Sequence, residues 1–165
     1  MEKYQIKIHK DSAQDCDLET YAEFLCDSPL VRETAEELGL VYGSYHQQYL
    51  VDDRIVCVAV LDLLPGCVSS VYLYYHPDWW GAQPSLSPGT YSALREIQLT
   101  QQLGLPYYYM GYYSHNINKM RYKGRFLPSH LLSPSLLSWH HITLCSPSLE
   151  SQRLSTFNTV QPVQV

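Results

Sequence analysis

Three predicted strands joined by two tight turns constrain the fold most. Residues 44–51 and 54–63 have the composition of two strands, and Asp52-Asp53 between them is typical of a hairpin turn. Pro65-Gly66 then turns the chain into a third strand, residues 68–75. Connections this short join antiparallel neighbours. The sequence therefore predicts an antiparallel sheet at the centre of the fold.

A helix and another strand are expected next. Ser87 and Pro88 are typical of a helix start, because serine caps free N–H groups and proline suits the first turn, and Gly104 is typical of the end. Residues 79–87 are predicted as a loop and residues 106–112 as the last strand. The inner face of the helix is expected to carry Tyr91, Leu94, Ile97 and either Leu99 or Leu103.

Two elements are expected before the sheet. Residues 4–8 alternate weakly as a strand, and residues 17–26 carry apolar side chains spaced for one face of a helix. The order of elements predicts the α+β class, with a mixed, mostly antiparallel sheet flanked by helices. Several folds of this class share that order, so the order alone leaves them open.

Composition narrows the class of protein. Apolar residues make up 45% of the 165 residues, which fits one globular domain. The longest apolar run, residues 55–61, is far shorter than the roughly 20 residues that cross a bilayer, and the start lacks the apolar stretch of a secretory signal. We therefore expect no membrane partner and a cytoplasmic location, with the nucleus as a further one.

The five cysteines lack C-x-x-C spacing, so reduced thiols are expected.

The last residues differ in composition from the rest. From Cys145 the chain is rich in Ser, Thr, Gln and Pro, so we expect a domain over residues 1–144 and a disordered tail over residues 145–165. His140-His141 lacks the further ligand spacing of a zinc site, so no metal site is expected.

An aromatic segment runs directly into a basic one. Residues 107–113 read Tyr-Tyr-Tyr-Met-Gly-Tyr-Tyr, and residues 119–125 hold four of the 11 Lys and Arg residues in a chain with 16 Asp and Glu. A basic segment on an acidic protein attracts anions, and neighbouring tyrosines can stack on bases. The alternative is a core strand followed by a solvated charged loop.

Four motifs in a fixed order resemble one family. Residues 42–49 read Tyr-Gly-Ser-Tyr-His-Gln-Gln-Tyr, residues 62–75 begin Asp-Leu-Leu-Pro-Gly-Cys, residues 91–97 read Tyr-Ser-Ala-Leu-Arg-Glu-Ile, and residues 107–124 contain the aromatic and basic segments. Together they resemble the C-terminal catalytic region of eukaryotic arginyl-tRNA:protein transferases, over roughly residues 4–139. Those enzymes add arginine to proteins with N-terminal Asp, Glu or oxidised Cys, which marks them for N-end rule, ubiquitin-dependent degradation.

The resemblance implies a GNAT-like acyltransferase fold, in which the strands before and after the helix splay to form the active cleft. It also implies arginyl-tRNA and proteins with N-terminal Asp or Glu as partners, and we expect a monomer. The family's cysteine-rich N-terminal cluster, associated with an iron-sulfur cofactor, has no counterpart here, so no cofactor is expected in this chain. Residues 83–89 are poor in glycine, and Pro84 and Pro88 remove N–H donors, which disfavours coenzyme A.

Arginyl transfer needs little base strength. The α-amine of the acceptor attacks the ester that joins arginine to the tRNA, and an amine of pKa about 7.7–8.0 is partly neutral near pH 7. Positioning and electrostatics are therefore expected to supply most of the rate. The candidate catalytic residues are Asp62, Ser70, Tyr72 and Glu96.

Each candidate has an ordinary structural alternative. Asp62 follows three valines on one strand face and could bind the guanidinium of the transferred arginine, or it could cap the following turn. Glu96 could act similarly, or form an exposed ion pair on the helix with Arg95. Alternation predicts that Ser70, Tyr72 and Tyr74 share one face, where their hydroxyls could hold the ester or the amine, or form a half-buried strand.

The remaining candidates bind substrate. His46 could recognise the acidic acceptor or be structural. The substrate-binding candidates are His46, Gln47, Tyr74 and Tyr112, and the candidates for tRNA phosphates or the acceptor's carboxylate are Lys119, Arg121 and Lys123. Two function classes stay open: the catalytic half of an arginyltransferase, or a non-catalytic module that binds acidic N-termini or tRNA. A coenzyme A acetyltransferase is a distant third.

Overall fold

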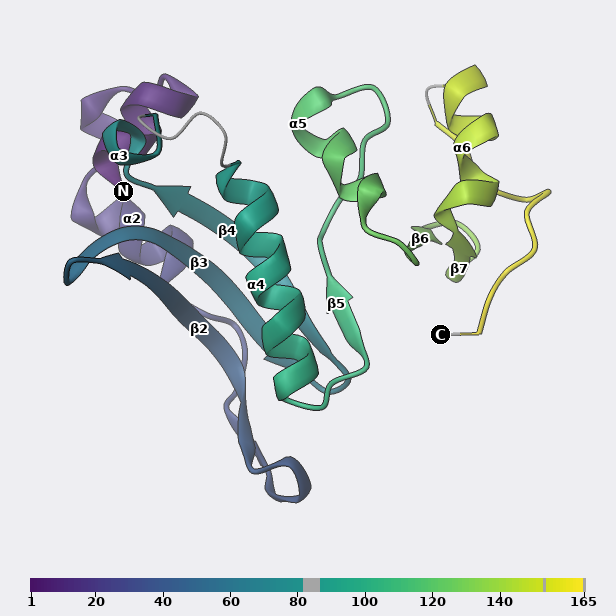
Figure 1. Ribbon diagram of the computed structural model, residues 1–165, viewed down its shortest axis with the longest axis horizontal. Helices are drawn as coiled ribbons and strands as arrows, with labels where there is room; N and C mark the ends of the chain where they lie inside the picture. The colour runs from purple at the N-terminus through teal and green to yellow at the C-terminus, as the bar shows by residue number, and fades with distance from the viewer. Residues whose placement is uncertain (82–86, 153, 165) are drawn as a thin grey trace. The chain divides into compact units, whose positions relative to one another are not determined.

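A five-stranded sheet of order β1-β2-β3-β4-β5 forms the centre of residues 1–111 (Figure 1). The computed structural model describes residues 1–81, 87–152 and 154–164. The pairs β1·β2, β2·β3 and β3·β4 are antiparallel, and β5 is parallel to β4. This mixed, mostly antiparallel sheet confirms the predicted α+β class. The strands are β1 (Glu33–Ala35), β2 (Leu40–Val51), β3 (Arg54–Leu64), β4 (Cys67–Tyr75) and β5 (Tyr107–Tyr109).

The predicted hairpin between β2 and β3 is confirmed. Asp52 and Asp53 both have positive φ, 48° and 59°, as the two central residues of a type I′ turn require. This turn matches the twist of the flanking strands, so the two longest strands pair directly across it. Of the expected last strand, residues 106–112, only Tyr107–Tyr109 pair with the sheet.

Helices cover both faces of the sheet. Alternate residues of β3, among them Ala59 and Leu61, form a core with Leu99 of α4 (Pro88–Gln102) and with Leu103, which directly follows that helix. The opposite face meets the segment before the sheet, where Tyr74 contacts Tyr21 of α2 (Leu18–Leu25). The N-terminal segment contains α1 (Glu2–Tyr4), the π-helix η1 (Gln5–His9), η2 (Ala13–Asp15) and α2, and the other short helices of this unit are η3 (Glu36–Leu38) and α3 (Pro77–Gly81).

The predicted strand over residues 4–8 is wrong. This segment is helical because it packs across the tyrosines of β4: Tyr4 is buried, with its ring centroid 4.8 Å from that of Tyr75. The Oε1 of Gln5 accepts a hydrogen bond from the Tyr72 hydroxyl at 2.9 Å. The weak alternation of the sequence is overridden by these contacts. The predicted helix over residues 17–26 is confirmed as α2, which Asp17 caps by accepting from the Thr20 N–H.

Helix α4 starts and ends where the sequence indicates, but its inner face is different. Pro88 occupies the first turn, and Gly104, with φ 68°, follows the end. Leu94, expected inside, is 53% exposed. The buried positions are small or polar, so hydrophobic periodicity alone misplaced the stripe. They are Ser92, Ala93, Glu96 and Thr100. The predicted loop over residues 79–87 is wrong at residues 79–81, which belong to α3. Residues 82–86 lie outside the described residues, as does most of the stretch used against coenzyme A.

Residues 112–165 form a second unit. The predicted basic loop consists of two short helices, α5 (Asn118–Arg121) and η4 (Tyr122–Arg125), and a hairpin of β6 (His130–Ser133) and β7 (Ser138–His141) follows. Helix α6 (Ile142–Ser151) covers the start of the segment predicted to be disordered, and Cys145 and Phe157 are buried. The domain end at residue 144 stays a prediction. Across the described residues, no helix is long and apolar enough to span a membrane.

Candidate functional site

Strands β4 and β5 part soon after they meet. Their parallel pairing covers only Cys67–Ser69 opposite Tyr107–Tyr109, whereas β4 continues to Tyr75 beside β3. A splay between the strands on either side of the helix is the feature expected of a GNAT-like fold, and the observed sheet is consistent with that fold. The residues that follow Ser69 on β4 therefore stand where the sheet opens.

An irregularity in β4 lies at this opening. Val60 pairs with Tyr72 but its neighbour Leu61 pairs with Ser70, so one extra residue, Val71, is inserted in β4. Successive residues of β3 point to opposite faces. Ser70 therefore faces the α4 side with Leu61, while Tyr72 and Tyr74 face the other side with Val60 and Val58. The prediction that Ser70, Tyr72 and Tyr74 share one face is wrong, because the inserted residue interrupts the alternation.

Asp62 is surrounded by serines. In the sheet it pairs with Ser44 of β2 on one side and Ser69 of β4 on the other. The Ser44 hydroxyl donates to Oδ1 of Asp62 at 2.5 Å, and the Ser28 hydroxyl lies 2.6 Å from that of Ser44. Asp62 is half-buried. Among the described hydrogen bonds its side chain bonds to a neighbouring strand, not to the turn, so the turn-cap alternative is not observed.

The tyrosine hydroxyls of β4 contact the N-terminal helices. Tyr72 Oη donates to Gln5 and lies 3.3 Å from Nε2 of His9, and Tyr74 Oη lies 3.1 Å from that of Tyr21. Burial raises the pKa of Tyr72 and, together with Tyr21, that of Tyr74. Both phenols therefore keep their protons near neutral pH and can donate hydrogen bonds.

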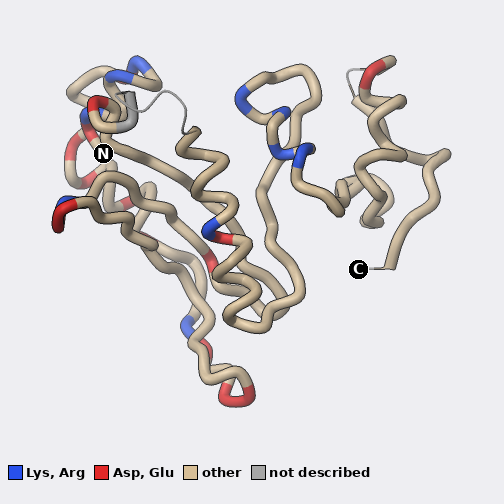
Figure 2. Tube along the Cα trace, viewed as in Figure 1, with Lys and Arg blue, Asp and Glu red and all other residues tan. Residues whose placement is uncertain are grey.

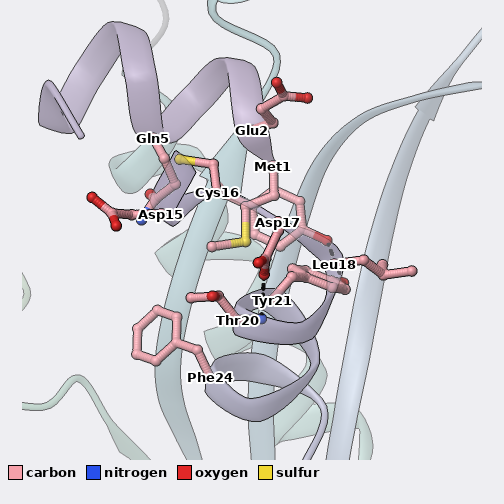
Figure 3. A pocket seen from close by; sticks show the side chains of 11 residues that line it. Met1, Glu2, Gln5, Asp15, Cys16, Asp17, Leu18, Thr20, Tyr21 and Phe24 are labelled. Atoms are coloured by element: carbon pink, nitrogen blue, oxygen red, sulfur yellow. Dashed lines mark hydrogen bonds between the residues drawn. The ribbon is translucent and has the colours of Figure 1, made fainter. Parts of the chain in front are cut away.

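An open pocket of about 420 Å³ is lined mostly by residues of the N-terminal segment (Figure 3), and Tyr74 also contributes to its wall. Two of its carboxylates are already used within the segment: Asp17 caps α2, which lowers its pKa, and Asp15 accepts from Ser12 at 2.7 Å. Of the predicted site residues only Tyr74 contributes to its wall. The lining consists of Met1, Glu2, Gln5, Asp15, Cys16, Asp17, Leu18, Thr20, Tyr21, Phe24 and Tyr74.

His46 makes the contact expected of a structural histidine. Its Nε2 lies 2.9 Å from the carbonyl oxygen of Leu25, at the end of α2. By register it lies on the same face of the sheet as Asp62 and Tyr72, since it pairs with Val60. Its role in substrate binding stays a prediction.

Glu96 is the most buried ionisable candidate, with 1% of its surface exposed. The Ser92 hydroxyl donates to one carboxylate oxygen, and the Tyr108 hydroxyl donates to the other at 2.7 Å. The expected exposed ion pair is wrong, because Arg95 points away and donates to Gln98. The sequence pattern concealed this burial, since the neighbouring Arg95 suggested a solvated face.

Hydrogen bonds continue from Glu96 to β2. Tyr49 Oη lies 3.4 Å from the Ser92 hydroxyl and donates to Oε1 of Gln47 at 2.9 Å. Burial, and to a lesser degree the Glu96 carboxylate, raises the pKa of Tyr49 to about 12. Gln47, a predicted substrate-binding residue, is thus connected with Glu96 on the α4 side of the sheet. The predicted candidates divide between two faces: Gln47, Ser70 and Glu96 on one, and His46, Asp62, Tyr72 and Tyr74 on the other.

Figure 2 shows in blue the Lys and Arg positions of the basic segment in the second unit. One lysine of this segment differs from the other cations in its burial and its hydrogen bond. Lys119, Arg121 and Arg125 are exposed, whereas Lys123 is half-buried and donates to the carbonyl oxygen of Tyr112 at 2.9 Å. Burial lowers the pKa of Lys123. Tyr112 itself is 84% exposed. Two of the three predicted tRNA-binding cations are therefore accessible, beside an exposed tyrosine.

Sequence reasoning missed the partners of both carboxylates. Register identifies Ser44 and Ser69 as neighbours of Asp62, and only the burial of α4 identifies Ser92 and Tyr108 as partners of Glu96. Serines next to motif residues carry no distinctive signal by themselves. Within the described ranges, no three His, Cys, Asp or Glu side chains gather as metal ligands.

Comparison with known proteins gives one consistent family. The family model for "Arginine-tRNA-protein transferase, C terminus" matches residues 1–133. The chain is 50% identical over 149 residues to Arginyl-tRNA--protein transferase 1 of Drosophila melanogaster, covering 86% of this chain and 29% of the relative. It is 40% identical over 173 residues to Arginyl-tRNA--protein transferase 2 of Arabidopsis thaliana, covering 98% and 28%.

A bacterial relative is more distant. An Aspartate/glutamate leucyltransferase of Campylobacter jejuni is 32% identical over 94 residues, covering 57% of this chain and 38% of the relative. The chain thus spans less than a third of the length of the Drosophila and Arabidopsis relatives.

Proposed function

This chain belongs to the family of the arginine-tRNA-protein transferase C terminus, and we propose that it supplies the catalytic region that transfers arginine from arginyl-tRNA to the N-terminal amine of proteins. The observation that carries the proposal is the family match over residues 1–133. In the reaction, the amine nitrogen bonds to the arginyl carbonyl carbon, the ester bond to the terminal ribose breaks, and the proton lost by the amine ends on the ribose oxygen.

The geometry around Asp62 supports binding of the arginyl group. Its carboxylate is half-buried, one of its oxygens is held by Ser44, and no Lys or Arg of the described residues forms an ion pair with it. A guanidinium pairs well with a carboxylate in such a setting, because two of its N–H groups can donate in parallel to the two carboxylate oxygens. We assign Asp62 to the guanidinium, and the hydroxyls of Tyr72 and Tyr74, which lie on the same face of the sheet as Asp62, to the ester and the incoming amine.

We further propose that the acceptor begins with Asp, Glu or oxidised Cys. The name of the Campylobacter relative specifies aspartate and glutamate as acceptors, while its donor is leucine rather than arginine. The acidic residues in this relative's name support an acidic acceptor for the present chain, with arginine in place of leucine as the transferred residue. Marking of the product for ubiquitin-dependent degradation, in the cytoplasm or the nucleus, belongs to the same proposal.

A transfer assay tests the proposal. The protein is incubated with radiolabelled arginyl-tRNA and peptides that begin with Asp, Glu or Lys, alone and with the remaining part of a full-length relative supplied. We expect label in the Asp and Glu peptides, none in the Lys peptide or an N-acetylated Asp peptide, and little transfer from leucyl-tRNA. Binding of tRNA or acidic peptides without transfer in either setting would favour the non-catalytic module instead.

The basic segment gives a prediction for tRNA binding. Each phosphate neutralised by a cation adds about 0.7–0.9 to the slope of log affinity against log salt. Replacing Lys119 and Arg121 by Ala should therefore reduce this slope by about 1–2, measured by filter binding at several salt concentrations. Lys123→Met is the matched control: Lys123 is half-buried and bonded to a backbone carbonyl, so it should change the slope little. Equal slopes for the double variant and the parent would return the segment to the solvated-loop alternative.

A further inference from the structure

The buried carboxylate of Glu96 joins three elements that meet at the opening of the sheet. One oxygen accepts from Ser92 of α4 itself, and the other from Tyr108 of β5. Ser92 lies 3.4 Å from Tyr49 of β2, which donates to Gln47. We call Gln47, Tyr49, Ser92, Glu96 and Tyr108 the Glu96 network.

Because the Glu96 carboxylate is buried among hydroxyls, direct substrate contact and a structural ion pair are both excluded as its role. A group 1% exposed does not touch a substrate in this structure, and its described partners are hydroxyls rather than a cation. Burying a carboxylate is costly even when it is hydrogen-bonded, and an apolar side chain would fill the same space without that cost. Core stability alone therefore gives little reason for a carboxylate at this position.

Tyr108 lies where β4 and β5 part. It pairs with Val68, and the pairing of the two strands ends one residue later, at Ser69 and Tyr109. The hydrogen bond from Tyr108 to Glu96 fixes this last paired stretch of β5 against α4. The position of β5 sets the opening between the strands, and Ser70 is the next residue of β4 at that opening.

We propose that Glu96 is a positioning residue for arginyl transfer, whose carboxylate fixes Tyr108 and thereby the separation of β4 and β5 at the catalytic opening. This deepens the proposed function and rests on it. At its other end the Glu96 network fixes Gln47: Tyr49 donates to Oε1 of Gln47, which leaves the amide N–H groups of Gln47 free to donate elsewhere.

The test compares Glu96→Gln with Thr100→Val. Gln keeps the shape of Glu96 but presents N–H donors to hydroxyls that themselves donate. Thr100, one turn later, is also buried, and its hydroxyl donates only to the backbone carbonyl of Glu96, so Thr100→Val perturbs the same helix face without touching the carboxylate. We expect Glu96→Gln to lower kcat at least tenfold while KM for arginyl-tRNA stays within about twofold of the parent's. We expect Thr100→Val to lose a similar amount of thermal stability and to keep kcat within about twofold of the parent's.

Two further readouts complete the test. Tyr108→Phe removes the donor and should lower kcat similarly, and the double variant should lose no more than the single variants, because both remove one interaction. Hydrogen exchange of the backbone amides of residues 107–109 should accelerate in Glu96→Gln and not in Thr100→Val. The inference would be overturned if the losses of kcat simply followed the losses of thermal stability in all variants. It would also be overturned if the losses of kcat were additive in the double variant, or if hydrogen exchange of residues 107–109 were unchanged in Glu96→Gln. If the parent transfers no arginine, the proposed function fails, while the exchange measurement still tests whether Glu96 fixes β5.

Discussion

Replacing Asp62 by Asn should lower the transfer of arginine by about 2–5 kcal/mol in kcat/KM, the loss seen when one member of a desolvated charge pair is removed. The asparagine keeps the shape of the side chain, and its oxygen can still accept from Ser44. It lacks the charge that the guanidinium requires. The fold should therefore persist while recognition of the arginyl group is lost.

The control separates arginine recognition from tRNA binding. Ser44→Ala retains the charge and removes only the hydrogen bonds of the Ser44 hydroxyl to Asp62 and Ser28, so its effect on kcat/KM should be about 1 kcal/mol. Binding of uncharged tRNA should be unchanged in both variants, since neither touches the basic segment. The measurement needs a preparation in which the parent transfers arginine. Equal kcat/KM for Asp62→Asn and the parent, with both well folded, would refute the assignment.

The central strands of the sheet and the turn between β2 and β3 could be predicted from the sequence, but the register between the strands could not. Asp52-Asp53 determines a two-residue turn, and counting back from it would place Gly43 opposite Asp62. A shift between Tyr49 and Leu50 places Ser44 there instead. The insertion of Val71 in β4 likewise separates Ser70 from Tyr72 and Tyr74. Bulges depend on packing between strands and not on local pattern, so the neighbours of the candidate site residues could not be counted from the turns.

The buried face of α4 shows a different limit of pattern reading. Apolar periodicity pointed to Leu94, yet the helix buries Ser92 and Glu96, because hydrogen bonds to Tyr108 and between these two residues satisfy their polar groups. A polar residue is predicted to be exposed unless its partner is known. Here one partner is on β5, outside any local window of sequence. Buried hydrogen-bond networks between distant elements are therefore the part of a site that is hardest to predict from a single sequence.

In residues 145–165, average composition likewise does not show which side chains are buried. Residues 145–165 are poor in large apolar side chains, and Phe157 is the only aromatic residue among them. That residue is buried, 5.7 Å between ring centroids from the buried His140, and Val163 donates its N–H to the carbonyl of Trp139. A few such contacts order a segment whose average composition favours disorder.

Phe157→Ala should accordingly destabilise the second unit by about 3 kcal/mol, as expected for loss of a buried aromatic side chain. The measurement is urea unfolding followed by circular dichroism, with hydrogen exchange in β6 and β7 to locate the loss. Leu154→Ala is the matched control, because Leu154 is 86% exposed and lies three residues earlier, so its effect should stay within about 0.5 kcal/mol. If Phe157→Ala is as silent as Leu154→Ala, the aromatic ring contributes no packing, and the disordered tail that the composition predicts is the correct description.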